Sequence, residues 1–340
     1  MNSPRPIEIV GGGLAGLSLG LALRRAGVPV TLFEAGSYPR HRVCGEFITG
    51  LSPATSARLG LEPFLASALR HDEVAWFLAD RLSRRQKLPS PARAISRFHL
   101  DQRLATAFVA AGGALRTQAR VDARTAVVGR VLATGRRSAR TTWLGLKIHV
   151  RGLPLQCDLE LHLGAHGYVG LTRVGDGRVN LCGLFRRREL AAQGATLILA
   201  YLRAAGLAGL ADRLVRADFD EQSFAAVAAV GFDERVRDSG PLALGDACAM
   251  IPPFTGNGMA MAFQSAEAAL APLLAYSRED LDWEEACRRI RVALQRRFRL
   301  RLATAGRLHP FLLDPARQPW LRRLAASGLL PLRPLYSLLH

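Results

Sequence analysis

Near the start of the chain, residues 7–16 read IEIVGGGLAG, a short apolar run that ends in a glycine-rich turn. Residues 14–26, rich in Leu and Ala, have the pattern of a helix that Gly27 closes, and residues 28–33 form a second apolar, β-branched run. A strand, a glycine turn, a helix and a second strand within about 30 residues are typical of a βαβ unit. The stretch therefore predicts a parallel sheet with a nucleotide-binding turn.

The glycine turn has the spacing G-x-G-x-x-G through Gly11, Gly13 and Gly16. The first glycine permits a tight turn, the second lets the backbone approach a pyrophosphate, and the third lets the helix pack closely on the strand. Because the following helix points its first N–H groups at this turn, Leu14 and Ala15 are expected to contact phosphate as well.

An acidic residue, Glu34, ends the second predicted strand, 23 residues after Gly11. A carboxylate at this place can accept hydrogen bonds from the two hydroxyls of a ribose, and Ala35 follows it into the same site. The combination predicts a dinucleotide site, and by itself it does not distinguish FAD from NAD.

A second motif lies in the last third of the chain. Residues 242–244 form a short apolar run that ends in Gly245-Asp246, and residues 252–259 read PPFTGNGM before a long helical pattern. A carboxylate at a strand end can accept hydrogen bonds from a polyol chain, and N–H groups at a helix start can stabilise negative charge on a reduced flavin. The candidate cofactor contacts here are Asp246, Pro253, Gly256, Asn257, Gly258 and Met259.

With both motifs present, nearly the whole chain resembles the FAD-dependent oxidoreductases of the para-hydroxybenzoate hydroxylase and geranylgeranyl reductase superfamily. The resemblance implies a Rossmann-like FAD-binding domain of the glutathione reductase type, in which Asp246 holds a ribityl hydroxyl of FAD. It also implies that Arg97, in the segment RFHLDQRL (97–104), reaches toward the FAD phosphates.

The loop RVCGE (42–46) resembles a segment that lies over the cofactor in the reductase-like members of the superfamily. This resemblance gives Arg42 and Gly45 as cofactor contacts. Cys44 either faces the flavin or is a packed free thiol.

One family motif differs in this chain. Many members carry Ala-Asp-Gly-Arg, whose Asp assists the binding of both FAD and nicotinamide. The corresponding segment is ATGR (133–136), in which Thr134 replaces the Asp and Gly135 remains an expected cofactor contact. NAD(P)H is the expected electron donor. Because Thr134 replaces the Asp, the nicotinamide would have to bind without that carboxylate.

Residues 143–185 alternate between apolar and polar in four short runs, which predicts an antiparallel sheet. Further strands are expected at 72–80 and 94–96, around a loop that contains residues 84–87, and a helix over 53–70. The predicted fold class is α/β: an FAD-binding domain with an inserted antiparallel substrate domain and C-terminal helices. The predicted bounds are 1–70, 94–140 and 235–280 for the FAD-binding domain, 71–93 and 141–234 for the substrate domain, and 281–340 for the helices.

The predicted sheet offers few candidates for acid–base chemistry. Lys147 and His149 are two residues apart on one strand, so both side chains are expected on one face, toward the substrate pocket. With Cys44 they are the weak catalytic candidates, and each is equally explained as a satisfied structural residue. The sequence contains no metal-ligand cluster and no Ser-His-Asp order, so no metal site is expected.

The resemblance implies two reactions for a small hydrophobic or aromatic substrate. The first is hydroxylation of an aromatic or polyketide-type molecule through a flavin C4a-hydroperoxide, which would make the protein a monooxygenase. The alternative is reduction or dehydrogenation of a prenyl-like compound. A basic FAD-binding or nucleic-acid-binding protein without catalytic activity is the second alternative.

The chain is strongly basic: 46 Lys and Arg oppose 28 acidic residues, a net charge of +18. Arg is spread through every segment rather than clustered, so nucleic acid is not an expected partner. Residues 281–340 hold 12 Arg against four acidic residues, a net +8, which suits either solvated helices or peripheral contact with an anionic membrane. Five widely spaced cysteines predict a cytoplasmic protein, and its oligomeric state stays open.

Overall fold

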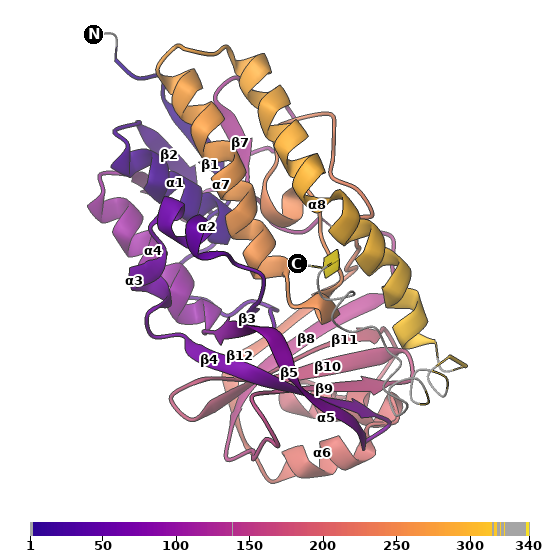
Figure 1. Cartoon of the computed structure of the whole chain (residues 1–340). Coiled ribbons are helices and arrows are strands. Elements are labelled where there is room, and N and C mark those ends of the chain that lie inside the picture. The colour runs from indigo at the N-terminus through magenta and orange to yellow at the C-terminus, as the bar shows by residue number, and fades with distance from the viewer. Residues whose placement is uncertain are drawn as a thin grey trace.

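A computed structural model describes residues 3–137, 139–314, 316–317, 320, 323 and 338–339 (Figure 1). Its first sheet is parallel, with four strands in the order β6-β2-β1-β7. The strands are β1 (Ile7–Val10), β2 (Val30–Phe33), β6 (Ala114–Arg116) and β7 (Arg130–Leu132). The helices around this sheet are α1 (Leu14–Arg25), α2 (Pro53–Leu59), α3 (Glu62–Leu65), α4 (Arg97–Ala110) and α7 (Gly258–Ser277).

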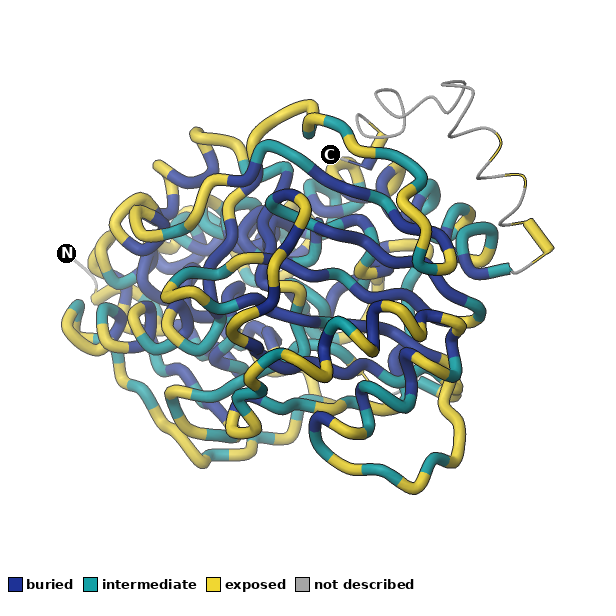
Figure 2. Tube along the Cα trace, turned by 90° about the horizontal axis from the view of Figure 1, so that it is seen from below, coloured by how far each residue is buried: buried dark blue, intermediate teal, exposed yellow. Residues whose placement is uncertain are grey.

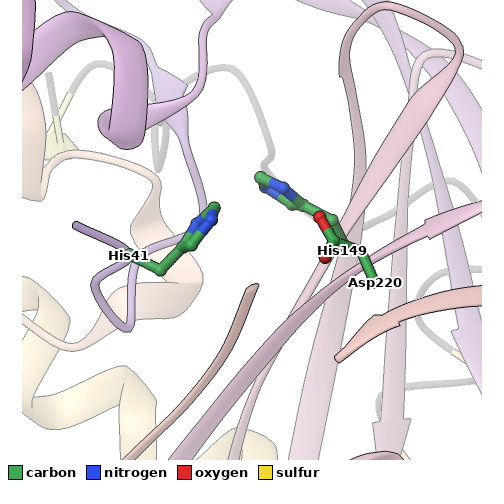
Figure 3. Close-up of side chains that lie close together, drawn as sticks. All are labelled: His41, His149 and Asp220. Carbon is green, nitrogen blue, oxygen red and sulfur yellow. The ribbon is translucent and has the colours of Figure 1, made fainter. Parts of the chain in front are cut away.

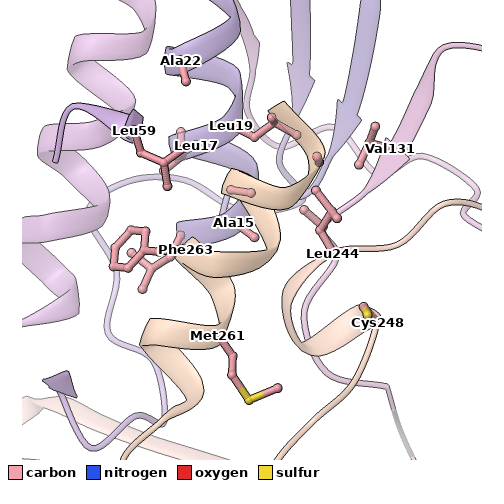
Figure 4. Close-up of a cluster of buried hydrophobic side chains, with 14 of the residues drawn as sticks. Ala15, Leu17, Leu19, Ala22, Leu59, Val131, Leu244, Cys248, Met261 and Phe263 are labelled. Carbon is pink, nitrogen blue, oxygen red and sulfur yellow. The ribbon is translucent and has the colours of Figure 1, made fainter. Parts of the chain in front are cut away.

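The core of this half forms because its helices are apolar on most of their surface. Ten of the twelve residues of α1 are buried, and α7 packs beside it. Figure 4 shows Leu17 and Leu19 of α1 near Phe263 of α7 and Leu244. Each such buried side chain stabilises the fold by about 1.5–3 kcal/mol, so this packing holds the glycine turn in place.

The second sheet has eight strands in the order β12-β8-β11-β10-β9-β4-β5-β3. One face packs against helices α5 (Gly194–Ala204) and α6 (Ala208–Val215), which bury Leu146, Ile148 and Val150. The strands are β3 (Phe47–Ile48), β4 (Leu69–Leu78), β5 (Arg81–Ala94), β8 (Trp143–Arg151), β9 (Leu159–Gly164), β10 (Gly167–Gly175), β11 (Arg178–Arg186) and β12 (Asp218–Ala228). The expected fold class, a parallel sheet with an antiparallel sheet inserted and helices at the C-terminus, is confirmed.

Three local expectations were wrong. Residues 84–87 lie inside the long strand β5 and not in a loop, and no separate strand covers 94–96. The helix expected over 53–70 is two short helices, because Gly60 ends α2 in a left-handed conformation, and β4 already begins at Leu69. Strand β5 tolerates its charges because much of it is exposed along the pairing with β4.

Helix α8 (Trp283–Leu313) runs along the molecule from the parallel sheet to the antiparallel one (Figure 1). It buries Ile290, Leu294, Phe298 and Leu302 and leaves many of its arginines exposed. Figure 2 shows how buried and exposed residues alternate along the described part of the chain. Of residues 281–340, for which membrane contact was expected, the structure describes 281–314 and six further residues, and it does not test that contact. Among those described, no helix is both long and apolar enough to cross a bilayer.

Candidate functional site

A large cavity of about 1900 Å³ lies between the two sheets. Its wall includes the glycine turn after β1, the loop of residues 40–45, the segment 133–136, the turn before α7 and the inner face of the antiparallel sheet. The two sequence motifs, far apart in the chain, therefore open into one space.

The glycines of the first motif have different tasks. A Cβ on Gly11 would lie 2.2 Å from the carbonyl oxygen of Ala133, and its φ of +113° suits only glycine. A Cβ on Gly16 would lie 2.0 Å from the carbonyl oxygen of Gly11, so this glycine permits the helix to pack; it does not line the cavity. A Cβ on Gly13 would meet nothing within 4 Å and would project beside the cavity.

The start of α1 faces this open space. Leu14 and Ala15 line the cavity, and the N-cap Gly13 makes no side-chain cap for the first N–H groups. Uncapped N–H groups at a helix start attract an anion. This end of the cavity therefore has the form of a phosphate cradle.

Glu34 lies at the cavity wall beside Ala35, where both were expected. Its Oε2 accepts a hydrogen bond from Gly12 N at 2.8 Å, and its Oε1 accepts from Gly36 N at 2.8 Å and from Arg40 at 2.9 Å. The carboxylate thus also holds the glycine turn in shape. Oε1 already accepts two hydrogen bonds, whereas Oε2 accepts one and keeps a second lone pair, so a ribose hydroxyl can still donate to Oε2.

Arg42 and Arg97 both line the cavity and share one buried carboxylate, Asp101. Arg97 binds Asp101 through Nε at 2.7 Å and Nη2 at 2.8 Å, and Arg42 binds it through Nε at 2.9 Å. Burial lowers the pKa of Arg97, but Asp101 outweighs it and the pKa is raised. Two guanidiniums on one carboxylate leave a net positive charge, which suits a pyrophosphate.

Asp246 lies in the cavity wall just after the bridge between Ala243 and Leu132. Its burial raises the pKa of the carboxyl from 3.8 to about 6, against the opposing charge of Arg97. Within the described part of the chain, no group donates a hydrogen bond to it. A half-buried acceptor that faces a cavity without a protein donor can take one from a ligand, and a polyol hydroxyl supplies it.

The turn before α7 delivers a second uncapped helix start to the cavity. Pro253, Gly256, Gly258 and Met259 line the space, and the N-cap Asn257 gives no side-chain cap. The Asn257 side chain does not line it: it is fully buried, and its Nδ2 donates to the carbonyl oxygen of Leu339 at 2.6 Å.

The loop after β2 and the segment 133–136 complete the wall. Cys44, Gly45, Thr134 and Gly135 all line the cavity. Burial raises the pKa of the Cys44 thiol, so at neutral pH the side chain is a thiol and not a nucleophilic thiolate. Positions 45 and 135, like 13 and 258, have no atom within 4 Å of a Cβ placed there, which leaves room for a ligand close to the backbone.

Lys147 and His149 share one face of β8, as expected, but they are absent from the cavity wall. Both are fully buried behind the loop of residues 41–46. Lys147 Nζ lies 3.0 Å from His41 Nδ1, and His149 Nε2 lies 2.6 Å from Glu46 Oε2. The expectation that they face a substrate was wrong because this loop covers that part of the sheet.

At the other end, the cavity is mostly apolar. Its wall is the alternating face of β4, β9, β10 and β11 together with the turn before α7 and the end of α8, and Arg84 and Gln86 of β5, which pair with Trp76 and Val74, also line it. The large side chains there are Trp76, Leu78, Leu161, Leu163, Tyr168, Leu184, Phe254, Phe311 and Leu312. Residues 71–93 were expected in the substrate domain, but none of the β4 side chains was predicted to line the pocket, although the alternating residues 74, 76 and 78 carried the signal.

The structure also gathers three groups that the sequence did not relate. His41, His149 and Asp220 hold potential metal-ligand atoms that all lie within 4.8 Å of one another (Figure 3). The three residues come from a loop and two strands that are far apart in sequence. Spacing along the chain could not reveal this cluster.

Comparison with known sequences identifies one matching domain family and one similar protein. The model of the NAD(P)-binding Rossmann-like domain matches residues 9–46, which contain the glycine turn and Glu34. A menaquinone reductase of Mycolicibacterium smegmatis is 31% identical over 108 residues, which is 31% of this chain and 26% of the relative. The match therefore spans only about a quarter of that protein.

Solved structures cover almost the whole chain. The p-nitrophenol 4-monooxygenase PnpA of Pseudomonas putida superimposes with a TM-score of 0.76 at 15% identity, over 100% of this chain and 97% of PnpA. HpxO of Klebsiella pneumoniae, complexed with FAD and uric acid, gives 0.75 at 15% identity, over 98% and 96% of the two chains. PqsL of P. aeruginosa, complexed with 2-aminobenzoylacetate, gives 0.73 at 17% identity, over 93% and 98%.

These similarities agree with the geometry of the cavity. Of the three superposed proteins, HpxO was solved with FAD and PqsL with a small aromatic ligand. At identities of 15–17% the superpositions establish the fold. The chain has the fold of these proteins, as its resemblance to the para-hydroxybenzoate hydroxylase and geranylgeranyl reductase superfamily implied.

Proposed function

We propose that the protein is an FAD-dependent oxidoreductase and acts as a monooxygenase on an aromatic or polyketide-type small molecule. The observation that carries this proposal is the cavity that joins a phosphate cradle to a large apolar chamber. Between the two ends lie Asp246 and the start of α7, where a flavin ring system would meet a substrate. The fold shared with PnpA, HpxO and PqsL supports it.

Each part of the wall has a proposed task toward FAD. The start of α1 binds the pyrophosphate together with Arg42 and Arg97, and Glu34 accepts from the adenosine ribose. Asp246 accepts from a ribityl hydroxyl, and the N–H groups at the start of α7 stabilise negative charge on the ring. Bound FAD supplies hydride acceptance and oxygen activation, whereas the protein supplies position and the exclusion of water.

The apolar chamber suits a neutral, planar substrate. Trp76, Tyr168 and Phe254 present aromatic surface, and Phe254 N donates to the hydroxyl of Tyr168 at 3.2 Å. Because this hydroxyl already holds the turn before α7, Tyr168 joins the substrate wall to the cofactor wall. We expect substrate contacts there to be mainly apolar.

We propose NAD(P)H as the electron donor. Thr134 and Arg136 both line the cavity, and burial lowers the pKa of Arg136. The guanidinium is nevertheless charged at neutral pH and can attract a nicotinamide nucleotide. Thr134 offers a hydroxyl where many superfamily members have a carboxylate.

The test begins with the purified protein. The proposal predicts a flavin absorption spectrum, either as isolated or after addition of FAD, and oxygen uptake that requires NAD(P)H and increases with a phenolic substrate. A protein that retains no flavin under either condition would contradict the assignment as an FAD-dependent oxidoreductase. Flavin retention without any NAD(P)H-dependent oxygen uptake would contradict only the monooxygenase assignment.

A second candidate is reduction of a carbon–carbon double bond in a hydrophobic substrate. The identity of 31% with a menaquinone reductase over 108 residues favours it, as does the apolar chamber. Anaerobic assays separate the two reactions. Saturation of an isoprenoid double bond by the dithionite-reduced protein without oxygen supports reductase activity, and a strict oxygen requirement supports the monooxygenase.

A further inference from the structure

A partly buried polar cluster lies beside the cavity, between the loop after β2 and strands β8 and β12. His41 belongs to the loop, His149 to β8 and Asp220 to β12. One nitrogen of each imidazole and a carboxylate oxygen of Asp220 all lie within 4.8 Å of one another (Figure 3). The proposed oxidoreductase chemistry assigns no task to this cluster.

Strand pairing fixes two of the three groups. Asp220 lies directly opposite His149 in the antiparallel pairing of β12 with β8, so their side chains project on the same face. The pairing is irregular just after Asp220, where Ser223 Oγ accepts from His149 N at 2.7 Å and donates to the carbonyl oxygen of Asp220 at 2.6 Å. These bonds tie the backbones of the two residues together.

The imidazole of His149 is held in one orientation. Its Nε2 lies 2.6 Å from Glu46 Oε2, and both side chains are fully buried. Glu46 is itself held, because it accepts from Arg97 N at 2.8 Å and from Ser96 Oγ at 3.2 Å. A carboxylate on one ring nitrogen leaves a lone pair on the other, and the Nδ1 of His149 is buried without a hydrogen-bond partner in the described structure. Metal-binding histidines typically have this arrangement.

His41 closes the cluster from the opposite side. Its ring stacks on Phe98 at a centroid distance of 4.4 Å, and its Nδ1 lies 3.0 Å from Lys147 Nζ. Its ring meets that of His149 edge-on, with centroids 5.3 Å apart. Lys147 therefore engages Nδ1 of His41 and leaves its Nε2 for a ligand bond.

From this geometry we propose that His41, His149 and Asp220 form a binding site for a first-row divalent cation of the Zn²⁺ type. Two imidazoles and one carboxylate are a common ligand set for such an ion, and they leave a fourth position for water. The carboxylates of Asp220 and Glu46 outnumber the single ammonium of Lys147, so the surroundings favour a cation. The ion would fasten the cavity-lining loop of residues 40–45 to the antiparallel sheet.

The chain contains a matched control. His162 Nε2 lies 2.9 Å from Glu160 Oε2, and its Nδ1 is buried and unpartnered, as in His149. However, the ring of Phe77 stacks on His162 at 4.2 Å, and Arg213 binds the same carboxylate at 3.0 Å. Among the described residues, no cluster of three ligand groups includes His162. A histidine–carboxylate pair alone therefore exists in this protein without a candidate site.

The experiment measures Zn²⁺ binding to the tag-free, full-length protein in competition with a chromophoric chelator. We expect one equivalent to bind, with affinity at least tenfold weaker in both Asp220→Asn and His41→Gln and unchanged in His162→Gln. His41 is only partly buried, so its replacement tests the site even if Asp220→Asn folds poorly. Equal binding by the wild type and both site variants, or no binding by the wild type, would overturn the proposal.

Cobalt gives a second measurement, which identifies the type of ligand atom by spectroscopy. Co²⁺ bound by imidazole and carboxylate gives visible absorption without the near-ultraviolet charge-transfer band of a thiolate ligand. That spectrum in the wild type, lost in His41→Gln, supports the site. A thiolate band would place the ion on a cysteine and overturn the assignment. Neither measurement depends on flavin content, so failure here leaves the proposed function untouched.

Discussion

The two ends of the cavity are built in different ways. At the cofactor end, the wall consists of backbone at glycines and of charges buried in pairs, such as Arg97 and Asp101. At the substrate end, the wall consists of apolar side chains from the alternating face of a sheet, such as Trp76 and Leu161. A wall of backbone and buried charge permits few substitutions, whereas a wall of side chains can change residue by residue. The predictions below test this difference.

The largest effect is expected from Arg97→Gln. This change leaves Asp101, which is fully buried, with only Arg42 as its ion-pair partner. Breaking a buried ion pair typically costs about 3–5 kcal/mol of unfolding free energy. Urea denaturation measures the cost. The control is Arg70→Gln, which breaks the exposed pair with Asp72 and should leave the denaturation midpoint unchanged. If both variants lost the same unfolding free energy, burial would not determine how much an ion pair stabilises this protein.

A pair of glycine variants separates folding from cofactor binding. Gly11→Ala places a Cβ 2.2 Å from the Ala133 carbonyl oxygen at a φ of +113°, and we expect a loss of roughly 3 kcal/mol of unfolding free energy. Gly13→Ala meets no atom within 4 Å, so stability should fall by less than about 1 kcal/mol. Because the new methyl group fills the phosphate cradle, FAD affinity should still fall roughly tenfold.

Denaturation and flavin titration of both variants check this prediction. A Gly13→Ala protein with unchanged FAD affinity would show that the open space at the start of α1 does not receive the pyrophosphate. A fully stable Gly11→Ala protein would contradict the close contact with Ala133.

Asp246→Asn should change stability and flavin retention in opposite directions. The folded pKa of about 6 lies above the ordinary 3.8, so the folded state binds this proton more tightly than the unfolded state does. The stability that Asp246 gives below pH 4 is therefore lost as the pH rises through 6, by about 3 kcal/mol for a shift of about two pKa units. Without flavin, Asp246→Asn should be more stable than the wild type at pH 7, and the difference should shrink toward pH 4.

In the presence of FAD, Asp246→Asn should weaken the binding of the cofactor. Asn cannot offer a charged acceptor to a ribityl hydroxyl, so FAD should be lost more readily on gel filtration. A flavin-free variant no more stable than the wild type at pH 7 would contradict the unpaired state of the buried carboxylate. Full flavin retention would contradict its contact with the ribityl chain.

The same contrast explains how much the sequence could predict. The glycine turn, Glu34 and the Gly245-Asp246 motif were found because each signal lies within a few adjacent residues whose roles are set by backbone geometry. The pair of His149 with Glu46 was missed because 103 residues separate the partners and only the folded loop joins them. Strand β5 was taken for a loop because its exposed side carries Arg and Lys. Strand β12 and helix α6 were not predicted, although Leu210, Ala211 and Leu214 of α6 have the spacing of a buried helix face.

The smallest effect on the fold, and the clearest on specificity, is expected from Trp76→Leu. Trp76 lines the apolar end, and its buried Nε1 has no hydrogen-bond partner among the described residues, so Leu removes a polar group that the fold does not satisfy. Stability should change by less than about 1 kcal/mol, and flavin retention should not change, because the cofactor end is untouched. The KM for an aromatic substrate should rise severalfold, since a flat aromatic wall is lost. Steady-state NAD(P)H oxidation with matched flavin content measures this. Loss of flavin in Trp76→Leu would show that the two ends are not independent, because a change in the side-chain wall would then have disturbed the backbone wall.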